Sequence, residues 1–377
     1  MPTADPARAS GRTYWPALDG LRGLAIIVVV LHNTTGIEVR DTLPEKLWTF
    51  VVDAGWVGVQ LFFVLSGFLI TGILLRSRGK ARALRSFYAR RALRIFPLYY
   101  LFLAGRFVLI PLFVPSTAVP FGEELPFWLY LSNWGDLLAT TPLAAMGHFW
   151  SLAVEEQFYL VWPALAMVLQ VRTFAWVCVG IAIAALASRV GMRVAGVPDK
   201  WMYAATFARA DALSLGALAA IALRNEKTRE LYRRVRMPSL VVAGLGLVAV
   251  MAYAHGLSRF EWLVQSVGYS LLAVLFAVLV TESATEVPRG WRRWLAHPAL
   301  RLVGKYSYAI YIIHVPVKYV LVNEVFDQPM FLDTAHSIVA DMAFIGLVAA
   351  ISFALAALSF VAIERPILRL KNRVSAG

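Results

Sequence analysis

Ten apolar runs, each long enough to cross a bilayer, constrain the fold of this sequence most strongly. About 20 apolar residues in a helix span the hydrocarbon core of a membrane. The runs lie near residues 17–37, 55–75, 95–114, 149–170, 173–190, 206–223, 239–256, 262–281, 302–322 and 338–362. Because only helices and closed barrels satisfy backbone groups within lipid, runs of this length predict an all-α, polytopic transmembrane helical bundle of about ten spans.

The composition agrees with a membrane protein. The 377 residues are 59% hydrophobic and 16% charged, whereas a soluble domain has about 45–50% apolar and about 25% charged residues. A shorter apolar piece, 125–135, is expected to form a surface helix or a re-entrant turn. The single cysteine, Cys178, excludes a disulfide framework and a multi-cysteine metal site, and no metal is expected.

The basic residues predict the orientation of the bundle. The net charge of +13 would suggest nucleic acid as a partner of a soluble protein. Here, if the N-terminus is cytoplasmic, 26 of the 36 Lys and Arg residues fall on the cytoplasmic side and six on the other. The positive-inside rule therefore predicts cytoplasmic tails at 1–16 and 367–377 and no nucleic-acid partner.

Ionisable residues inside the apolar runs are the candidate functional residues. Arg22 and His32 lie in the first run, and Glu155 and Glu156 lie in "HFWSLAVEEQFYLVWP" (148–163). The predicted orientation puts the two glutamates at roughly the depth of His32. Adjacent helical positions point about 100° apart, so the glutamates do not share one partner. A histidine and a carboxylate at one depth suit a general base and its orienting group, although His32 could instead only hydrogen-bond a neighbouring helix.

A second cluster, "FYARRALRIFPLYY" (87–100), contains Arg90, Arg91 and Arg94, which lie at the end of a predicted cytoplasmic loop at 76–94. Guanidinium groups suit phosphate oxygens. The alternative is that the cluster only fixes topology and contacts anionic lipid. In the second run, the small pair Ser66–Gly67 predicts close helix packing.

Together these stretches resemble the acyltransferase-3 family of integral membrane acyltransferases. The matching blocks are "ALDGLRGLAIIVVVLH" (17–32), "GVQLFFVLSGFLIT" (58–71), "RRALRIFPLYY" (90–100), "FWSLAVEEQFYLVWP" (149–163), "GKYSYAIYIIHVPV" (304–317) and "ERP" (364–366). The resemblance implies a multi-pass protein of the bacterial inner membrane. Such an enzyme takes an acyl group, commonly acetyl, from cytoplasmic acyl-CoA and passes it to a hydroxyl of a carbohydrate or glycolipid acceptor, usually at the outer face.

The resemblance also implies roles for particular residues. The Arg and His motif of the family's first helix corresponds to Arg22 and His32, and the paired arginines to Arg91 and Arg94. We therefore expect a catalytic set and an acyl-CoA-binding set: His32, Glu156, Glu155 and Asp53 for catalysis, and Arg22, Arg90, Arg91 and Arg94 for the donor. Asp53 is included because an outer-side carboxylate there could join His32.

Two positions depart from the family pattern. Nine residues separate Arg22 from His32 where ten are usual, and Asn33 occupies the usual histidine slot. Ten helical steps end about 80° from the starting face, whereas eleven return to within about 20°. His32 would then reach the site through its rotamer or a local π-bulge. The other departure is Gln60, where the family often has an acid.

The chain ends soon after its tenth predicted span, so we expect a single domain over 1–377 without the hydrolase-like domain of some relatives. A transporter or flippase is the main alternative function, with Arg22, Arg209, Glu156 and Lys318 lining a path. A non-catalytic scaffold would leave these charges unexplained. The acceptor, the acyl chain length and the oligomeric state stay open.

Overall fold

The structure is a computed structural model that describes residues 14–35, 42–138, 143–284, 287–326 and 337–369. Every regular element within these ranges is helical, and none is a strand. The prediction of an all-α polytopic bundle is therefore confirmed. The outer parts of the two predicted tails, 1–13 and 370–377, lie outside the described residues.

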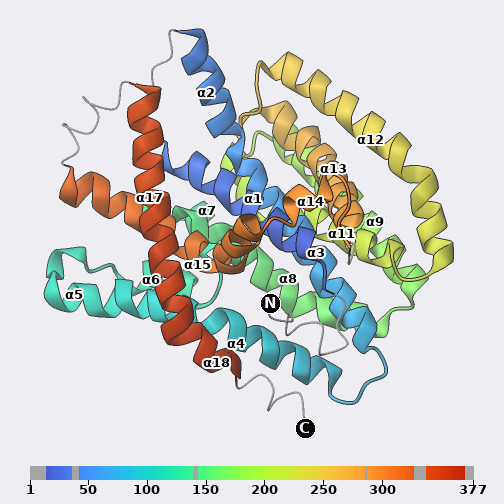
Figure 1. Cartoon of the computed structure of the whole chain (residues 1–377), viewed down its shortest axis with the longest axis horizontal. Helices are drawn as coiled ribbons and strands as arrows, with labels where there is room; N and C mark the ends of the chain where they lie inside the picture. The colour runs from blue at the N-terminus through green and yellow to red at the C-terminus, as the bar shows by residue number, and fades with distance from the viewer. Residues whose placement is uncertain (1–13, 36–41, 139–142, 285–286, 327–336, 370–377) are drawn as a thin grey trace.

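A helix occupies each of the ten predicted positions (Figure 1). These are α1 (Pro16–Thr34), α3 (Val57–Ser77), α4 (Ala83–Ala104), α8 (Trp150–Val168), α9 (Val171–Val194), α11 (Thr206–Ala222), α12 (Glu226–Ala254), α13 (Tyr269–Ser283), α15 (Pro298–Val320) and α17 (Ile338–Ser359). The shorter α-helices are α2 (Leu43–Asp53), α5 (Ile110–Phe113), α6 (Phe121–Trp128), α7 (Ser132–Leu138), α10 (Asp199–Ala204), α14 (Arg292–Leu295) and α18 (Arg365–Arg369). Single turns of 3-10 or π geometry extend several of them.

The ten predicted spans differ in how strongly their composition favours a membrane. By length and composition, eight helical stretches among the described residues could cross a membrane. Helices α8 and α15, with 19 and 23 residues, are long enough, but they carry more polar and charged side chains. Helix α15 packs along α1, and α8 packs against α3. These contacts bury one face of each helix, whereas Leu160 and Val161 of α8 and Val320 of α15 are exposed.

Helix α4 begins well before the span predicted at 95–114. It starts at Ala83 and continues through a π turn (Gly105–Leu109) and α5 to Phe113. The arginines of the cluster at 90–94 therefore lie on a helix that could cross the membrane, and the prediction of a loop over 76–94 is wrong for most of its length. Strong helix formers such as Ala, Leu and Arg fill this segment and explain the difference.

Glycines bring the central helices into backbone contact. A Cβ at Gly67 of α3 would lie 1.9 Å from the Leu213 carbonyl oxygen of α11, and one at Gly216 of α11 would lie 2.1 Å from the Val64 carbonyl oxygen. Gly304 of α15 makes an equally close approach to α1, 1.9 Å from the Asp19 oxygen. Only glycine permits such spacing, so the predicted packing role of Gly67 is confirmed.

Peripheral helices surround this centre. Helix α12 lies along one edge of the molecule, and α17 lies toward the opposite side (Figure 1). Large apolar side chains on α12, including Val242, Leu245 and Val248, are exposed, as expected for a surface that faces lipid. The apolar piece predicted at 125–135 forms parts of α6 and α7. The Tyr99 and Tyr100 hydroxyls of α4 donate to the carbonyls of Phe127 and Trp128 in α6.

Candidate active site

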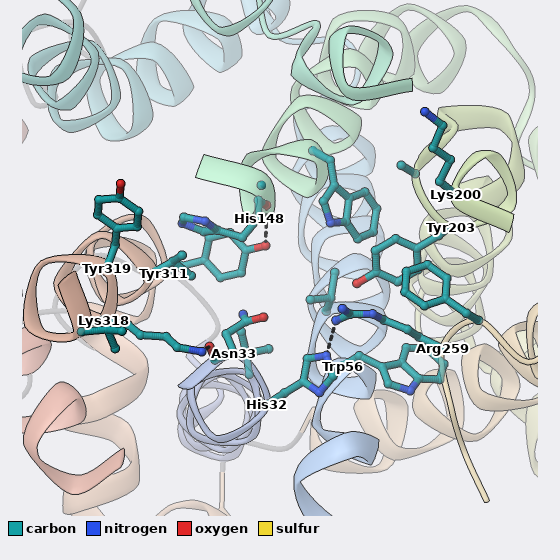
Figure 2. A pocket seen from close by; sticks show the side chains of 18 of the residues that line it. His32, Asn33, Trp56, His148, Lys200, Tyr203, Arg259, Tyr311, Lys318 and Tyr319 are labelled. Atoms are coloured by element: carbon teal, nitrogen blue, oxygen red, sulfur yellow. Dashed lines mark hydrogen bonds between the residues drawn. The ribbon is translucent and has the colours of Figure 1, made fainter. Parts of the chain in front are cut away.

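A cavity of about 580 Å³ lies beside the C-terminal half of α1, between the start of α3 and α15 (Figure 2). His32 and Asn33 of α1 form one wall of this cavity, and Trp56 stands beside them. Across it lie Tyr311 and Lys318 of α15, and Tyr203 and Arg259 close a third side. Residues far apart in the sequence therefore meet around one space large enough for a small molecule.

The His32 ring is fixed by hydrogen bonds at both nitrogens. Its Nδ1 lies 2.9 Å from the Val52 carbonyl oxygen. A carbonyl oxygen only accepts, so Nδ1 carries the proton and donates. Nε2 then carries the lone pair and accepts a hydrogen bond from Arg259 Nη1 (Figure 2). Nε2, the nitrogen of His32 that can act as a base, thus faces the cavity and is covered by the Arg259 guanidinium.

Helix α1 remains a regular α-helix from Pro16 to Thr34. The shorter Arg22–His32 spacing is therefore accommodated without the π-bulge that the sequence left open. His32 reaches the cavity because Gly55 lies against α1, where an added Cβ would be 2.9 Å from the His32 Cβ. The close approach brings Val52, just before this turn, to the imidazole.

Arg259 lies on the short connection between α12 and α13, and aromatic contacts hold its side chain in place. Its guanidinium carbon lies 4.9 Å from the Phe260 ring centroid and 5.5 Å from that of Tyr203. The Tyr269 hydroxyl donates to the Arg259 carbonyl at 2.7 Å. These contacts aim the arginine at His32.

Asn33 binds a second buried imidazole. His314 Nδ1 donates to the Tyr311 carbonyl at 2.8 Å, so its Nε2 accepts from the Asn33 amide at 3.0 Å. Lys318, one turn further along α15, donates to the Asn33 carbonyl at 3.0 Å. Asn33 therefore joins α1 to α15, while the neighbouring His32 reaches Arg259.

His148 lies on the same cavity wall as Tyr311, in the turn before α8. The Tyr311 hydroxyl donates to the His148 carbonyl at 2.9 Å (Figure 2). Burial, with His314 beside it, keeps the pKa of the His148 imidazole well below its ordinary value. His148 is thus a neutral polar group of the wall.

The two glutamates do not lie at the depth of His32, contrary to the expectation from the sequence. Glu155 accepts hydrogen bonds from Ser66 at 3.0 Å and Tyr159 at 2.8 Å, and Arg91 approaches it to 4.0 Å. His148 already reaches the cavity, and Glu155 lies seven residues further along the chain, or about 10 Å deeper in a helix. Ser66 also has a polar role there beyond the small size noted in the sequence.

Neither Glu156 nor Asp53 reaches His32. Glu156 is half-buried next to Glu155, and Asp53 is exposed beyond Val52. Neither is among the described residues that line the cavity. The group that orients the imidazole is therefore a backbone carbonyl, and the prediction that one of the three carboxylates serves this purpose is wrong in this structure.

A cationic cluster surrounds the other half of α1. Arg22 of α1 lies within electrostatic range of Arg94, and Arg94 within range of Arg91, both on α4. Arg91 stacks on Tyr159 at 3.7 Å, and Arg90 turns to Ser86 on its own helix. Within the described part of the chain, no carboxylate oxygen lies within 4.0 Å of Arg22 or Arg94. Asp19 lies within electrostatic range of Arg94 but forms no direct ion pair with it, so these guanidinium groups keep the charge that an anion would pair with.

The two groups of functional residues are stacked along α1. Arg22 and His32 are ten residues apart, which corresponds to about 15 Å along a helix. The structure brings Arg22, Arg91, Arg94 and Glu155 together at one level, and His32, Arg259 and Lys318 together at the other. Sequence reasoning missed Val52 and Arg259, because neither residue lies in a motif that indicates a functional site.

The transporter alternative places Arg209 along a permeation path. In the structure, Arg209 is instead enclosed by hydrogen-bonding and packing partners inside the bundle. It is fully buried, donates to Gln60 Oε1 at 2.7 Å and lies 4.0 Å from the Tyr269 ring centroid. Arg189 beside it pairs with Asp211 at 2.8 Å. Gln60 therefore serves the buried Arg209, and neither residue faces the cavity.

Comparison with known proteins identifies relatives over most of the chain. A family model described as an acyltransferase domain matches residues 15–362. The chain is 26% identical to peptidoglycan O-acetyltransferase OatA of Listeria monocytogenes over 322 residues, 81% of this chain and 50% of that protein. It is 28% identical to the putative peptidoglycan O-acetyltransferase YrhL of Bacillus subtilis over 330 residues, 81% of this chain and 48% of that protein.

O-acetyltransferase OatA of Staphylococcus aureus is similar as well, 25% identical over 336 residues, 84% of this chain and 52% of that protein. The chain thus spans about half the length of these relatives. No solved structure matches the chain significantly.

Proposed function

The chain belongs to this acyltransferase family, and from that premise we propose that it is a membrane-embedded O-acyltransferase of the bacterial plasma membrane. It takes an acyl group, which we assign as acetyl, from acyl-CoA on the cytoplasmic side. It transfers this group to a hydroxyl of a cell-envelope or exported carbohydrate. The names of the relatives, two of them peptidoglycan O-acetyltransferases, support a carbohydrate acceptor and an acetyl donor group.

The arginine cluster is the proposed donor end. Arg22 and Arg94 carry charges that no carboxylate within 4.0 Å neutralises in the described chain. Coenzyme A carries phosphates at one end and its thiol at the other, so phosphates held at this level would let the pantetheine arm extend along α1. Arg91, backed by Glu155 and Tyr159, would hold its guanidinium toward the same ligand. Arg90, at the next position, would assist from the rim.

His32 is the proposed general base. Its Nε2 takes the proton of the acceptor hydroxyl as that oxygen attacks the thioester carbonyl carbon. The new C–O bond forms, the C–S bond breaks, and the imidazolium returns the proton to the departing coenzyme A thiolate. Val52 stabilises the required tautomer through Nδ1, because a base that must accept at Nε2 needs its proton at Nδ1.

The carboxylates have indirect parts in this proposal. Glu155 holds Arg91 and, through Ser66, ties α8 to α3. Glu156 lies beside Glu155, within electrostatic range of Arg91. Asp53 lies next to Val52 on the helix that presents the carbonyl to His32. All three act through other residues and are positioning residues.

What supports this function most directly is the His32 Nε2 at the wall of a cavity, about 15 Å along α1 from Arg22, which has no carboxylate within 4.0 Å in the described chain. The test uses purified protein in nanodiscs with acetyl-CoA labelled in its acetyl group. Free coenzyme A thiol should appear and label should pass to envelope glycan fragments. A transporter would release no thiol, and that result would overturn the proposal.

A further inference from the structure

The cavity beside His32 is lined by cations. Lys200, Arg259 and Lys318 all line it, whereas no Asp or Glu is found among its described lining residues. Lys318 and Arg259 stand on opposite sides of the space (Figure 2). A neutral sugar would not require this arrangement, because charges in a site partly removed from water are costly unless an opposite charge is supplied.

The partners of these cations within the protein are mostly neutral. Lys318 Nζ donates to the carbonyls of Asn33 at 3.0 Å and Thr35 at 3.4 Å. Asp341 lies within electrostatic range of Lys318, but it accepts hydrogen bonds from Thr35 and Trp48 and does not line the cavity. Arg259 donates to the uncharged nitrogen of His32. An anion in the cavity would therefore gain charge-assisted hydrogen bonds from both sides.

Aromatic rings complete the walls. Trp56, Tyr203, Phe260 and Tyr319 line the same space. The C–H faces of a pyranose pack well on such rings, and Tyr hydroxyls can reach its polar edge. The Trp56 N–H donates to the Leu257 carbonyl and holds that ring in place. The combination of flat apolar surfaces with opposed cations fits an acidic sugar better than a neutral sugar or a simple anion.

We propose that the acceptor is an acidic saccharide whose carboxylate or phosphate pairs with Arg259 and Lys318. This inference rests on the proposed acyl transfer and specifies its acceptor class. Pairing with an anion would also draw the Arg259 guanidinium off His32 Nε2, and the vacated lone pair could then accept the proton of a neighbouring sugar hydroxyl. The acidic group of the acceptor thus both binds the sugar and uncovers the base.

The test compares three sugars that differ only at C6, namely glucose, glucuronate and glucose 6-phosphate. Binding to the full-length protein in nanodiscs is followed by tryptophan fluorescence, since Trp56 and Trp150 line the cavity. We expect at least one acidic sugar to bind about 10-fold or more tightly than glucose, as one net charge-assisted hydrogen bond provides. Tighter binding of glucuronate would identify a carboxylate as the preferred group, and tighter binding of glucose 6-phosphate would identify a phosphate.

The variants Arg259→Met and Lys318→Met should each bring the affinity for the acid close to that for glucose. Lys305→Met is the matched control, because Lys305 lies on the same helix as Lys318 but near Phe360, away from the cavity; the preference should survive in this variant. Equal binding of all three sugars by the wild type, no binding of either acid, or a preference unchanged in both cavity variants would overturn the inference. Since no donor is present, these results do not depend on turnover of acetyl-CoA.

Discussion

At the scale of the residue, the reactivity of His32 depends on its two hydrogen bonds. The Val52 carbonyl takes the Nδ1 proton, and Arg259 donates to Nε2. The first bond holds the ring in the tautomer that a base requires, and the second covers the nitrogen that would act. The nucleophilicity of this nitrogen is therefore controlled by a side chain from a different helical connection.

Removal of Arg259 should expose the base nitrogen. Diethyl pyrocarbonate acylates an unprotonated imidazole nitrogen, so Arg259→Met should raise the rate of His32 carbethoxylation severalfold. Mass spectrometry of the peptide that contains His32 measures the rate. Lys318→Met, which removes a cavity cation without touching His32, should leave it nearly unchanged. Equal rates in the wild type and Arg259→Met would show that the guanidinium does not cover Nε2 in solution.

The donor end makes an equally specific prediction. Arg94→Gln should weaken acetyl-CoA binding about 10-fold, since a hydrogen bond to a charged group contributes about 1.5–3 kcal/mol. Arg85→Gln is the control, because Arg85 is exposed on the same helix and carries the same charge. Isothermal titration of both variants decides the matter. If Arg85→Gln weakened binding as much, only the general positive charge of the helix would be involved.

At the scale of the element, backbone contact between helices determines how the site is assembled. Gly67 of α3 and Gly216 of α11 permit one such contact, and Gly304 of α15 permits another against α1. The second contact fixes the rotation of α1 relative to α15, and hence the positions of Asn33 and His314. Glycines outside the cavity therefore determine where the residues that line it are positioned.

Gly67→Ala should destabilise the bundle, because its Cβ would lie 1.9 Å from the Leu213 carbonyl oxygen. Overpacking of this kind costs about 1–3 kcal/mol. A thermal unfolding scan in detergent should show a clearly lowered midpoint. Gly244→Ala on α12 is the matched control, since a Cβ there meets nothing within 4 Å and its helix propensity improves. An unchanged midpoint in Gly67→Ala would mean that α3 and α11 can separate without loss.

The sequence predicted the helices well because apolar runs reflect the solvent that surrounds them. It predicted the depth of Glu155 poorly. The prediction assumes that α8 begins at the membrane surface, whereas His148, just before α8, already lines the cavity, so Glu155 lies deeper. Val52 acts through its backbone carbonyl, so the identity of its side chain does not indicate this role. Arg259 reaches His32 only through tertiary packing across 227 positions, and no local pattern encodes such a contact.

At the scale of the whole molecule, the proposed reaction requires two chemically distinct ends of the helical bundle. The arginine cluster and the His32 cavity lie about 15 Å apart along α1. The distribution of basic residues in the connections predicts that the arginine end is cytoplasmic. Acyl transfer across this distance would let a donor made in the cytoplasm serve an acceptor on the other side.

Reporter fusions test this orientation. Fusion after Lys80, in the turn between α3 and α4, should report the cytoplasm, and fusion after Ser258, beside Arg259, should report the outside. The expected pattern follows from the excess of Lys and Arg in the first of these connections. The reverse pattern would place the His32 cavity on the cytoplasmic side and remove the reason for a two-sided reaction.

The most direct test of the central claim measures acetyl-CoA binding and acetyl transfer on the same variant, His32→Ala. A general base contributes about 10²–10⁴-fold to the rate, so transfer should fall by that factor while the Kd for acetyl-CoA stays close to the wild-type value. Asn33→Ala, one residue further on, should cost much less, because its amide serves His314. Near-normal transfer by a correctly folded His32→Ala protein would contradict the account.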